Sequence, residues 1–445
     1  MPVLTRVTLV LLVMFAVMSM AFEATFGSLL AFSVGPINVH LFDLLLLLAA
    51  VLLAHEVTLE HGQRVPAANR TVLAIVLGYC AYQIAVILPV SVAFHDLEPI
   101  AVARQLESRF ALILIPFVYL VGLKYMSPRR LVAWVNTAAM LLALFALYKY
   151  ATVGIQGEQV GSGAFRLREL WGGATLLFGF LILTSLFLQR PNAFAYAMAL
   201  VGVIGMALTN HRSGYIALIV TVPPLLINSR RVARRAAVVL LVVLSAGLLL
   251  FAVSPTARES VIYSLRTMAN PTADRNARDR LDRSRLGWDY FVANPLGDYQ
   301  WSHRYYLVHV SDNFEPHNFV IQLLGQQGIV GFAFFAGLIV TTARIGWRNR
   351  RRDRMSAVML AYFAFYLLFC LFNTNLLNVD NILLLIIPVA LILARNAALA
   401  QDAEKAGCSE AGVESERLTP AHDAHRAGAN GDDCAALMYS GAGPL

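Results

Sequence analysis

A succession of long apolar runs is the feature that most constrains how this chain can fold. A helix needs about 20 mostly apolar residues to cross a hydrocarbon core of ~30 Å. The sequence contains twelve candidate runs, some short enough to require extension by flanking residues. We therefore predict an all-α polytopic membrane protein with about twelve transmembrane helices, at 7–22, 39–54, 71–91, 110–123, 131–148, 172–188, 193–209, 213–228, 236–254, 318–343, 356–372 and 379–395.

Composition excludes most other classes of protein. Hydrophobic residues make up 58% of the 445 positions and charged residues only 14%, against roughly 25% charged residues in soluble domains. A soluble fold has too little interior to bury so much apolar surface. A cytosolic enzyme, a secreted disulfide scaffold and a DNA-binding domain are therefore excluded. The four cysteines form no CxxC pair, so neither a zinc site nor a redox pair is encoded locally.

The distribution of basic residues predicts the orientation in the membrane. With a cytoplasmic N-terminus, 21 of the 35 Lys and Arg residues fall on the inside and 14 on the outside. Eight of those 14 lie in one long loop, whose charge has little influence on insertion. The clearest inside markers are SRRVARR at 229–235 and RIGWRNRRRDR at 344–354. Cytoplasmic loops therefore account for the net charge of +8, and no nucleic-acid partner is predicted.

The alternation of apolar runs and polar loops divides the chain into regions. Residues 1–395 are predicted to form the transmembrane domain, with 255–317 as one long extracytoplasmic loop. Residues 396–445 are rich in Ala, Gly, Asp and Glu and have no apolar period, so we predict a disordered cytoplasmic tail. The protein is expected to be a multi-pass protein of a cytoplasmic membrane, in contact with membrane lipids.

Familiar motifs of energy-consuming or metal-dependent chemistry are missing from the sequence. There is no GxxxxGK[ST], HExxH, GxSxG or DxD pattern. We therefore predict neither a cofactor nor a metal site. Energy for any reaction then has to come from an activated substrate or from an ion gradient.

A polar break interrupts two apolar runs on the predicted outer face. In NHRSGYIAL, 210–218, Arg212 lies where the eighth span begins, next to Ser213. A lone arginine at a membrane boundary often extends its guanidinium toward the headgroups without a further role. The neighbouring Asn210 and His211 make a polar cluster and favour a function.

Two other outer segments carry arginines of interest. Arg166 and Arg168, in GAFRLREL at 163–170, oppose the positive-inside trend. They indicate either an anionic partner outside the membrane or an anchor to anionic lipid. In ADRNARDRLDRSRLGW, 273–288, acids and arginines four residues apart are expected to neutralise each other on a helix face. Arg285 directly precedes the apolar stretch LGWDYF, and we single it out.

The tenth span begins with a histidine. Pro316 suits the first turn of a helix, which places His317 and Asn318 at the N-terminal end of the span. The helix dipole there disfavours an imidazolium ion. A neutral imidazole is what a general base requires. The alternative is a histidine that only satisfies polar groups at the helix end.

Together these segments resemble the O-antigen ligase and polymerase family of bacterial membrane glycosyltransferases. The family pattern has an RSG segment opening a span, an R-x-x-W segment before a P-L-x-G turn, and an outer loop ending in H-N before an L-x-x-x-G-x-x-G helix. This chain has RSGY at 212–215, RLGW at 285–288, NPLG at 294–297 and HNFVIQLLGQQGIVG at 317–331. The resemblance covers about 160–345. One departure is GSGAFRLRELWGGA at 161–174, where members often have a P-N pair.

The resemblance implies a GT-C-like fold and a reaction. A glycan linked to undecaprenyl diphosphate is the donor, and an acceptor hydroxyl attacks its anomeric carbon on the periplasmic face of the inner membrane. The acceptor is another glycan or lipid A–core, which would make the chain an enzyme of lipopolysaccharide or other surface-polysaccharide synthesis. In this interpretation His317 is the base and Arg212 is catalytic. Arg212, Arg285, Arg166 and Arg168 hold the diphosphate, and Asn318 and Ser213 support the site.

Two further functions remain open on the sequence. A multispan transporter or flippase of a polysaccharide precursor has a similar number of spans, but no charged residue lies in the middle of a predicted span, where a coupling ion would bind. A non-catalytic assembly protein with the same fold is the third possibility. The sequence does not separate a ligase from a polymerase.

Overall fold

The computed structural model of the chain describes most of the predicted transmembrane domain. The described residues are 1–22, 31–34, 37–59, 65–95, 109–153, 157–160, 164–167, 173–189, 192–209, 211–226, 275–297, 318–372 and 379–418, with isolated residues between 234 and 262. Most of the long loop and the end of the chain lie outside these ranges.

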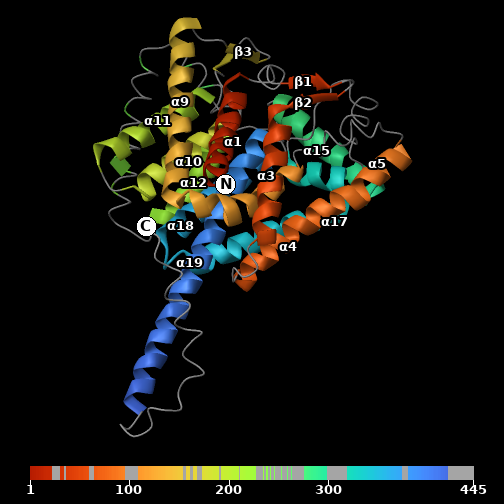
Figure 1. Cartoon of the computed structure of the whole chain (residues 1–445). Helices are drawn as coiled ribbons and strands as arrows, with labels where there is room; N and C mark the ends of the chain where they lie inside the picture. Colours follow the sequence, from red (N-terminus) through yellow and green to blue (C-terminus); the bar gives the residue numbers. More distant parts are fainter. Residues whose placement is uncertain are drawn as a thin grey trace.

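Helices build the molecule (Figure 1). Within the described ranges, six helices are long and apolar enough to cross a membrane, and five shorter apolar helices accompany them. The prediction of an all-α polytopic membrane protein is confirmed. The principal helices are α1 (Pro2–Phe22), α3 (Leu41–Leu59), α4 (Ala67–Tyr82), α5 (Leu88–His95), α9 (Pro128–Val153), α10 (Ala174–Phe187), α11 (Ala193–Thr209), α12 (Arg212–Leu226), α15 (Arg275–Ala293), α17 (Phe319–Asn349), α18 (Arg354–Leu371) and α19 (Val379–Leu418).

Eleven of the twelve predicted apolar runs coincide with these helices or with the helical segment Ala111–Tyr125. The twelfth, 236–254, lies largely outside the described residues. Helix α10 is buried along its whole length, and it packs against α9, α11 and α18. The core of the bundle therefore lies around α10.

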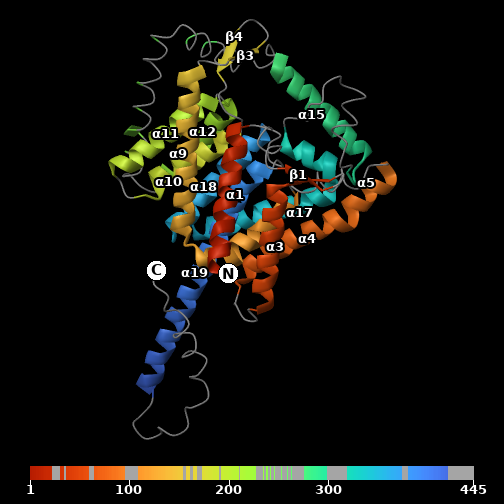
Figure 2. The same cartoon turned by 45° about the horizontal axis from the view of Figure 1, so that its top comes forward.

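Two short β-hairpins, which the sequence analysis did not predict, add to the helices. Strand β1 (Ala31–Val34) pairs antiparallel with β2 (Ile37–His40), and β3 (Gly157–Val160) pairs antiparallel with β4 (Ala164–Leu167). A Gly-Pro dipeptide separates the first two strands, and such a dipeptide typically marks a turn. Figure 2 shows β3, β4 and α15 at the end of the bundle opposite to the N-terminus and the far part of α19.

Hydrogen bonds at the end with the N-terminus link helices that the predicted topology brings to the cytoplasm. Asn69 of α4 donates to the carbonyl of Leu393 at 2.8 Å and accepts from Asn396 at 2.8 Å. Asp353 caps α18 and pairs with Arg395 at 2.8 Å. Burial raises the pKa of the Asp353 carboxyl, but hydrogen bonds from Arg395 and Ser356, together with the charge of Arg395, lower it below its usual value. These contacts bring the starts of α4 and α18 next to α19 at the end of the bundle that the predicted topology places in the cytoplasm.

Helix α19 corrects one sequence prediction. It continues to Leu418, so residues 396–418 are helical where the sequence analysis expects a disordered tail. The reason is composition, because Ala, Glu, Lys and Arg have high helix propensity and they dominate this stretch. The extension projects away from the bundle (Figures 1 and 2). Residues 419–445 of the predicted tail lie outside the described residues.

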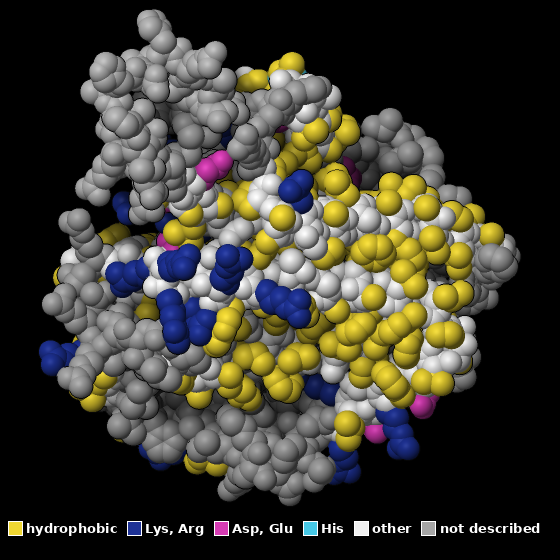
Figure 3. Space-filling model, turned by 90° about the horizontal axis from the view of Figure 1, so that it is seen from below, with side chains coloured by type: hydrophobic (Ala, Val, Ile, Leu, Met, Phe, Trp, Pro, Cys, Tyr) yellow, Lys and Arg dark blue, Asp and Glu magenta, His cyan; other side chains and the backbone are white. Residues whose placement is uncertain are grey.

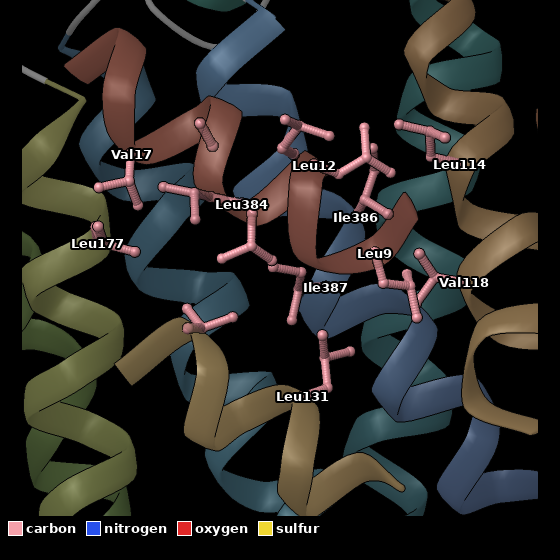
Figure 4. Close-up of a pocket in the computed structure, with 14 residues that line it drawn as sticks. Leu9, Leu12, Val17, Leu114, Val118, Leu131, Leu177, Leu384, Ile386 and Ile387 are labelled. Atoms are coloured by element: carbon pink, nitrogen blue, oxygen red, sulfur yellow. The ribbon is translucent and has the colours of Figure 1, made fainter. Parts of the chain in front are cut away.

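An apolar cavity of about 30 Å³ lies between α1, α9, α10 and α19. Figure 4 shows its lining, which consists of aliphatic side chains, among them Leu9, Leu131 and Ile387. No charged group lines it. It is a packing gap in the core and does not offer the cations that a diphosphate needs.

Candidate functional site

Helix α12 begins at Arg212, as the sequence analysis predicts. Only the backbone of Arg212 is described, and Ser213 beside it is half-buried. The preceding His211 is buried, with its ring edge-on to Phe369 of α18 at 6.0 Å between centroids. His211 is therefore a packed structural residue, and Arg212 is the cation that opens this span.

Close packing fixes the position of this helix start. A Cβ on Gly214 would collide with the Thr175 methyl group at the start of α10. The Thr175 and Thr209 hydroxyls are hydrogen-bonded at 2.8 Å. The C-terminal end of α11, the start of α12 and the start of α10 therefore meet at one end of the bundle. A side chain larger than glycine would push the Arg212 backbone away from α10.

Helix α15 carries Arg285 within the predicted long loop. The Arg285 side chain is exposed, whereas Arg283 is buried at 5% exposure. Arg278 and Asp282 are both exposed and form no ion pair among the described residues. The structure confirms the predicted helix. The predicted neutralisation of Arg278 by Asp282 is wrong. An exposed pair of this kind contributes little to stability in any case.

The NPLG turn after α15 locks onto α17. Gly328 interrupts α17 with φ 65° and ψ −172°, and Gly297 of the turn has φ 86°. The Ile329 amide donates to the carbonyl of Pro295 at 3.0 Å. A Cβ on either glycine would collide with backbone of the other segment. Two motifs of the predicted family pattern therefore meet at one interlock.

The N-terminal part of α17 starts as the sequence predicts. Asn318 is the N-cap residue, and its Oδ1 accepts from the amides of Val320 at 3.0 Å and Ile321 at 3.3 Å. This bond anchors the chain directly after His317. His317 itself lies outside the described residues.

The other predicted site residues are only partly placed. Arg166 lies in β4, in register with Glu158 of β3, and only its backbone is described. Arg168 lies outside the described residues. The structure brings the helix of Arg285 against α17, and it packs both α12 and α17 against α18. The segments that carry Arg212, Arg285 and Asn318 are thus connected through α17 and α18.

A buried polar cluster beside the kink was missed by the sequence analysis. The Tyr79 hydroxyl donates to Gln327 Oε1 at 2.6 Å, and Gln83 Nε2 donates to the same oxygen at 3.2 Å. Arg109 donates through Nη2 to Gln326 Oε1 at 2.5 Å and is 5% exposed. In an interior without water such bonds are strong and the loss of a partner is costly.

This cluster ties α4 to the kink of α17. The Tyr82 hydroxyl donates to the carbonyl of Gln327, next to Gly328, at 3.0 Å. Gln83 is the first residue of a π-helical turn, Gln83–Ile87, and such turns are frequent at functional sites. The signal that the sequence offered was glutamine within apolar runs, which marks polar interactions inside a membrane bundle.

Replacing Gly328 with alanine is expected to lower the stability of the protein. Its φ and ψ are accessible essentially to glycine alone, and such strain costs about 1–3 kcal/mol before any collision is counted. The measurement is thermal unfolding of the purified protein in detergent. Gly337→Ala in the same helix is the matched control, because a Cβ there makes only an ordinary 3.5 Å contact with Ile75. Equal melting temperatures for both variants would contradict the interlock.

Among the described residues, no three His, Cys, Asp or Glu side chains come close enough to hold one metal ion. Arginine, glutamine, asparagine and tyrosine are the polar groups of the site. They suit the binding of anionic and hydroxyl-bearing groups.

Comparison with known proteins bears on the same region. A family model described as O-antigen ligase matches residues 197–336. The match spans α11, α12, α15 and the kinked first half of α17, and it includes the four quoted motifs. No curated protein matches the chain. The resemblance found in the sequence is confirmed, and it supports assignment of the chain to the O-antigen ligase family.

Proposed function

We propose that this chain, assigned to the O-antigen ligase family through residues 197–336, transfers glycan from an undecaprenyl-diphosphate donor onto an acceptor hydroxyl. The observation that carries the proposal is the coincidence of the family match with the interlocked α15–α17 unit. In that unit Asn318 is the N-cap of α17, and the match also includes the arginine that opens α12. The acceptor is either another glycan or lipid A–core.

The proposed reaction forms one bond and breaks one. The acceptor oxygen attacks the anomeric carbon of the donor sugar, and the bond from that carbon to the diphosphate oxygen breaks. His317 takes the proton of the attacking hydroxyl as a general base. The lipid diphosphate leaves with the electron pair of the broken bond. The diphosphate linkage supplies the driving force, and no metal or cofactor enters the proposal.

Arginines are proposed to stabilise the leaving diphosphate. Guanidinium groups bind phosphate oxygens in a bidentate manner, and fixed cations are most effective where charge develops. Arg212 is assigned this role and is also counted as catalytic. Arg285 is exposed on α15 and is proposed to contact the donor from outside the bundle. Arg166 and Arg168 are proposed as further diphosphate contacts, with Ser213 and Asn318 supporting the site.

The proposal places the site on the periplasmic side of the inner membrane. Fusions of a reporter at Arg231 and Arg350 are expected to report a cytoplasmic location, and a fusion near Asn276 an extracytoplasmic one. The reason is the concentration of basic residues in short loops on one side. Activity of a cytoplasmic reporter at Asn276 would contradict the site, because the donor would then lie on the wrong side.

The function itself is tested in a deletion strain. Loss of the protein is expected to leave surface glycan unattached or unextended, with lipid-linked precursor accumulating. Attached glycan with a single repeat would indicate a polymerase, and unattached long glycan a ligase. Precursor confined to the cytoplasmic leaflet would instead indicate a flippase, which the family match does not favour.

A further inference from the structure

A groove of about 320 Å³ lies between the first turns of α1 and α9. It is at the end of the bundle that holds the N-terminus, opposite the candidate site (Figure 2). Its volume is within the range of ligand pockets, about 300–1,000 Å³. The proposed transfer reaction leaves this groove without a role.

Two arginines line the groove. Arg6 Nε donates to the carbonyl of Tyr125 at 2.8 Å, which holds its guanidinium at the groove. Arg130 of α9 is exposed. Within the described part of the chain neither arginine forms an ion pair, whereas the nearby Lys124 is paired with Glu56 at 2.6 Å. The groove therefore carries two positive charges that have no ion-pair partner among the described residues.

Apolar side chains continue the groove away from these charges. Val10 follows Arg6 by one turn of α1, and Trp134 follows Arg130 by one turn of α9. Four residues span about 6 Å along a helix. Leu11 and Trp134 are 40% and 44% exposed. Both helices begin at this end of the bundle. The two arginines therefore lie nearer the membrane surface, and the apolar side chains of the groove lie deeper in the membrane.

This order of groups matches a phospholipid in a membrane. A phosphate lies at the interface and acyl chains lie deeper, and Trp is favoured at that boundary. Basic pockets between transmembrane helices bind anionic headgroups. Figure 3, seen from below, shows Lys and Arg side chains gathered on this face beside a broad hydrophobic area. A site of this composition is suited to a lipid that carries net negative charge.

We propose that the groove between α1 and α9 binds one anionic glycerophospholipid, with its phosphate on Arg6 and Arg130 and an acyl chain along Val10, Leu11 and Trp134. In the predicted topology this lipid belongs to the cytoplasmic leaflet. It joins α1 to α9 at their first turns. It is separate from the lipid-linked donor, which the proposed function places on the other side of the membrane.

The test uses the full chain in a mild, lipid-free detergent. Its thermal stability is measured during titration with phosphatidylglycerol, with phosphatidylcholine of the same chains, and with inorganic phosphate. We expect stabilisation by phosphatidylglycerol only. The affinity of the Arg6→Gln/Arg130→Gln double variant is expected to be lower by about 30-fold, since each arginine contributes roughly a fivefold factor.

Two further variants keep the test decisive. Arg129→Gln is the matched control, because Arg129 is an exposed neighbour that does not line the groove; its affinity should equal that of the unmodified protein. Arg130→Gln alone retains the Arg6–Tyr125 bond and serves if the double variant does not fold. Equal stabilisation by phosphatidylcholine or by phosphate, unchanged affinity of the arginine variants, or an equal loss in Arg129→Gln would overturn the proposal.

Discussion

Replacing His317 with alanine is expected to slow glycan transfer by about 10²- to 10⁴-fold, because general-base assistance is typically worth that much. The loss corresponds to about 3–5 kcal/mol of activation free energy. Stability should change little, since the helix start is secured by the neighbouring Asn318, which caps it with two hydrogen bonds. The measurement is the initial rate of transfer from a lipid-diphosphate donor by purified protein.

Other histidines provide controls for His317. His303 and His309 are in the same predicted outer loop but outside the H-N motif, so their alanine variants should retain most activity. His211 is packed against Phe369, so its alanine variant should lower the melting temperature more than the turnover of the folded fraction. A His317→Ala protein within about threefold of the unmodified rate would defeat the base assignment. The arginines would then carry the chemistry alone.

Replacing Arg212 with lysine is expected to reduce transfer by about 10- to 10²-fold, although the charge is kept. Removal of a donor from an oxyanion site costs about 10²–10³-fold, and a lysine retains the charge but not the bidentate geometry. Arg212 is the first residue of α12, and its backbone is fixed by the Gly214–Thr175 contact. The Arg212 guanidinium therefore extends toward the donor from a fixed backbone position.

The control for Arg212 is an arginine that only faces the membrane boundary. Arg70, exposed in α4 at the opposite end, fits this description, and its lysine variant should be fully active. If Arg212→Lys also transfers glycan at nearly the normal rate, the arginine only extends toward the headgroups and does not bind the diphosphate. Initial rates at several donor concentrations separate weaker donor binding from slower turnover.

Much of the fold could be predicted because it follows from length and hydropathy. Eleven predicted spans are helices of the structure, and the contacts of Asn69, Asn396 and Asp353 bring together the helix ends that the basic residues assign to one side. The start of α17 could be located only approximately from local signals: the sequence places Pro316 in the first turn, whereas the helix begins at Phe319 with Asn318 as its N-cap.

The interlock and the polar cluster could not be predicted in the same way. Tyr79 and Gln327 are 248 residues apart in the chain, and no local pattern joins them. Gly328 breaks the helix within an apolar run, and no local pattern in that run predicts the break. Spacing also did not reveal that Arg283, not Arg285, is the buried arginine of α15. Which side of an amphipathic helix faces the protein depends on the helix that packs against it, and the sequence of the helix alone does not identify that neighbour.

The most direct test of the proposed function is a transfer assay with purified protein in vesicles that contain the lipid-diphosphate glycan and an acceptor. Glycosylated acceptor and free lipid diphosphate should appear together in equal amounts, and neither should form with the His317→Ala protein. Movement of intact donor between the leaflets without any glycosylated acceptor would contradict the proposal and identify the chain as a transporter.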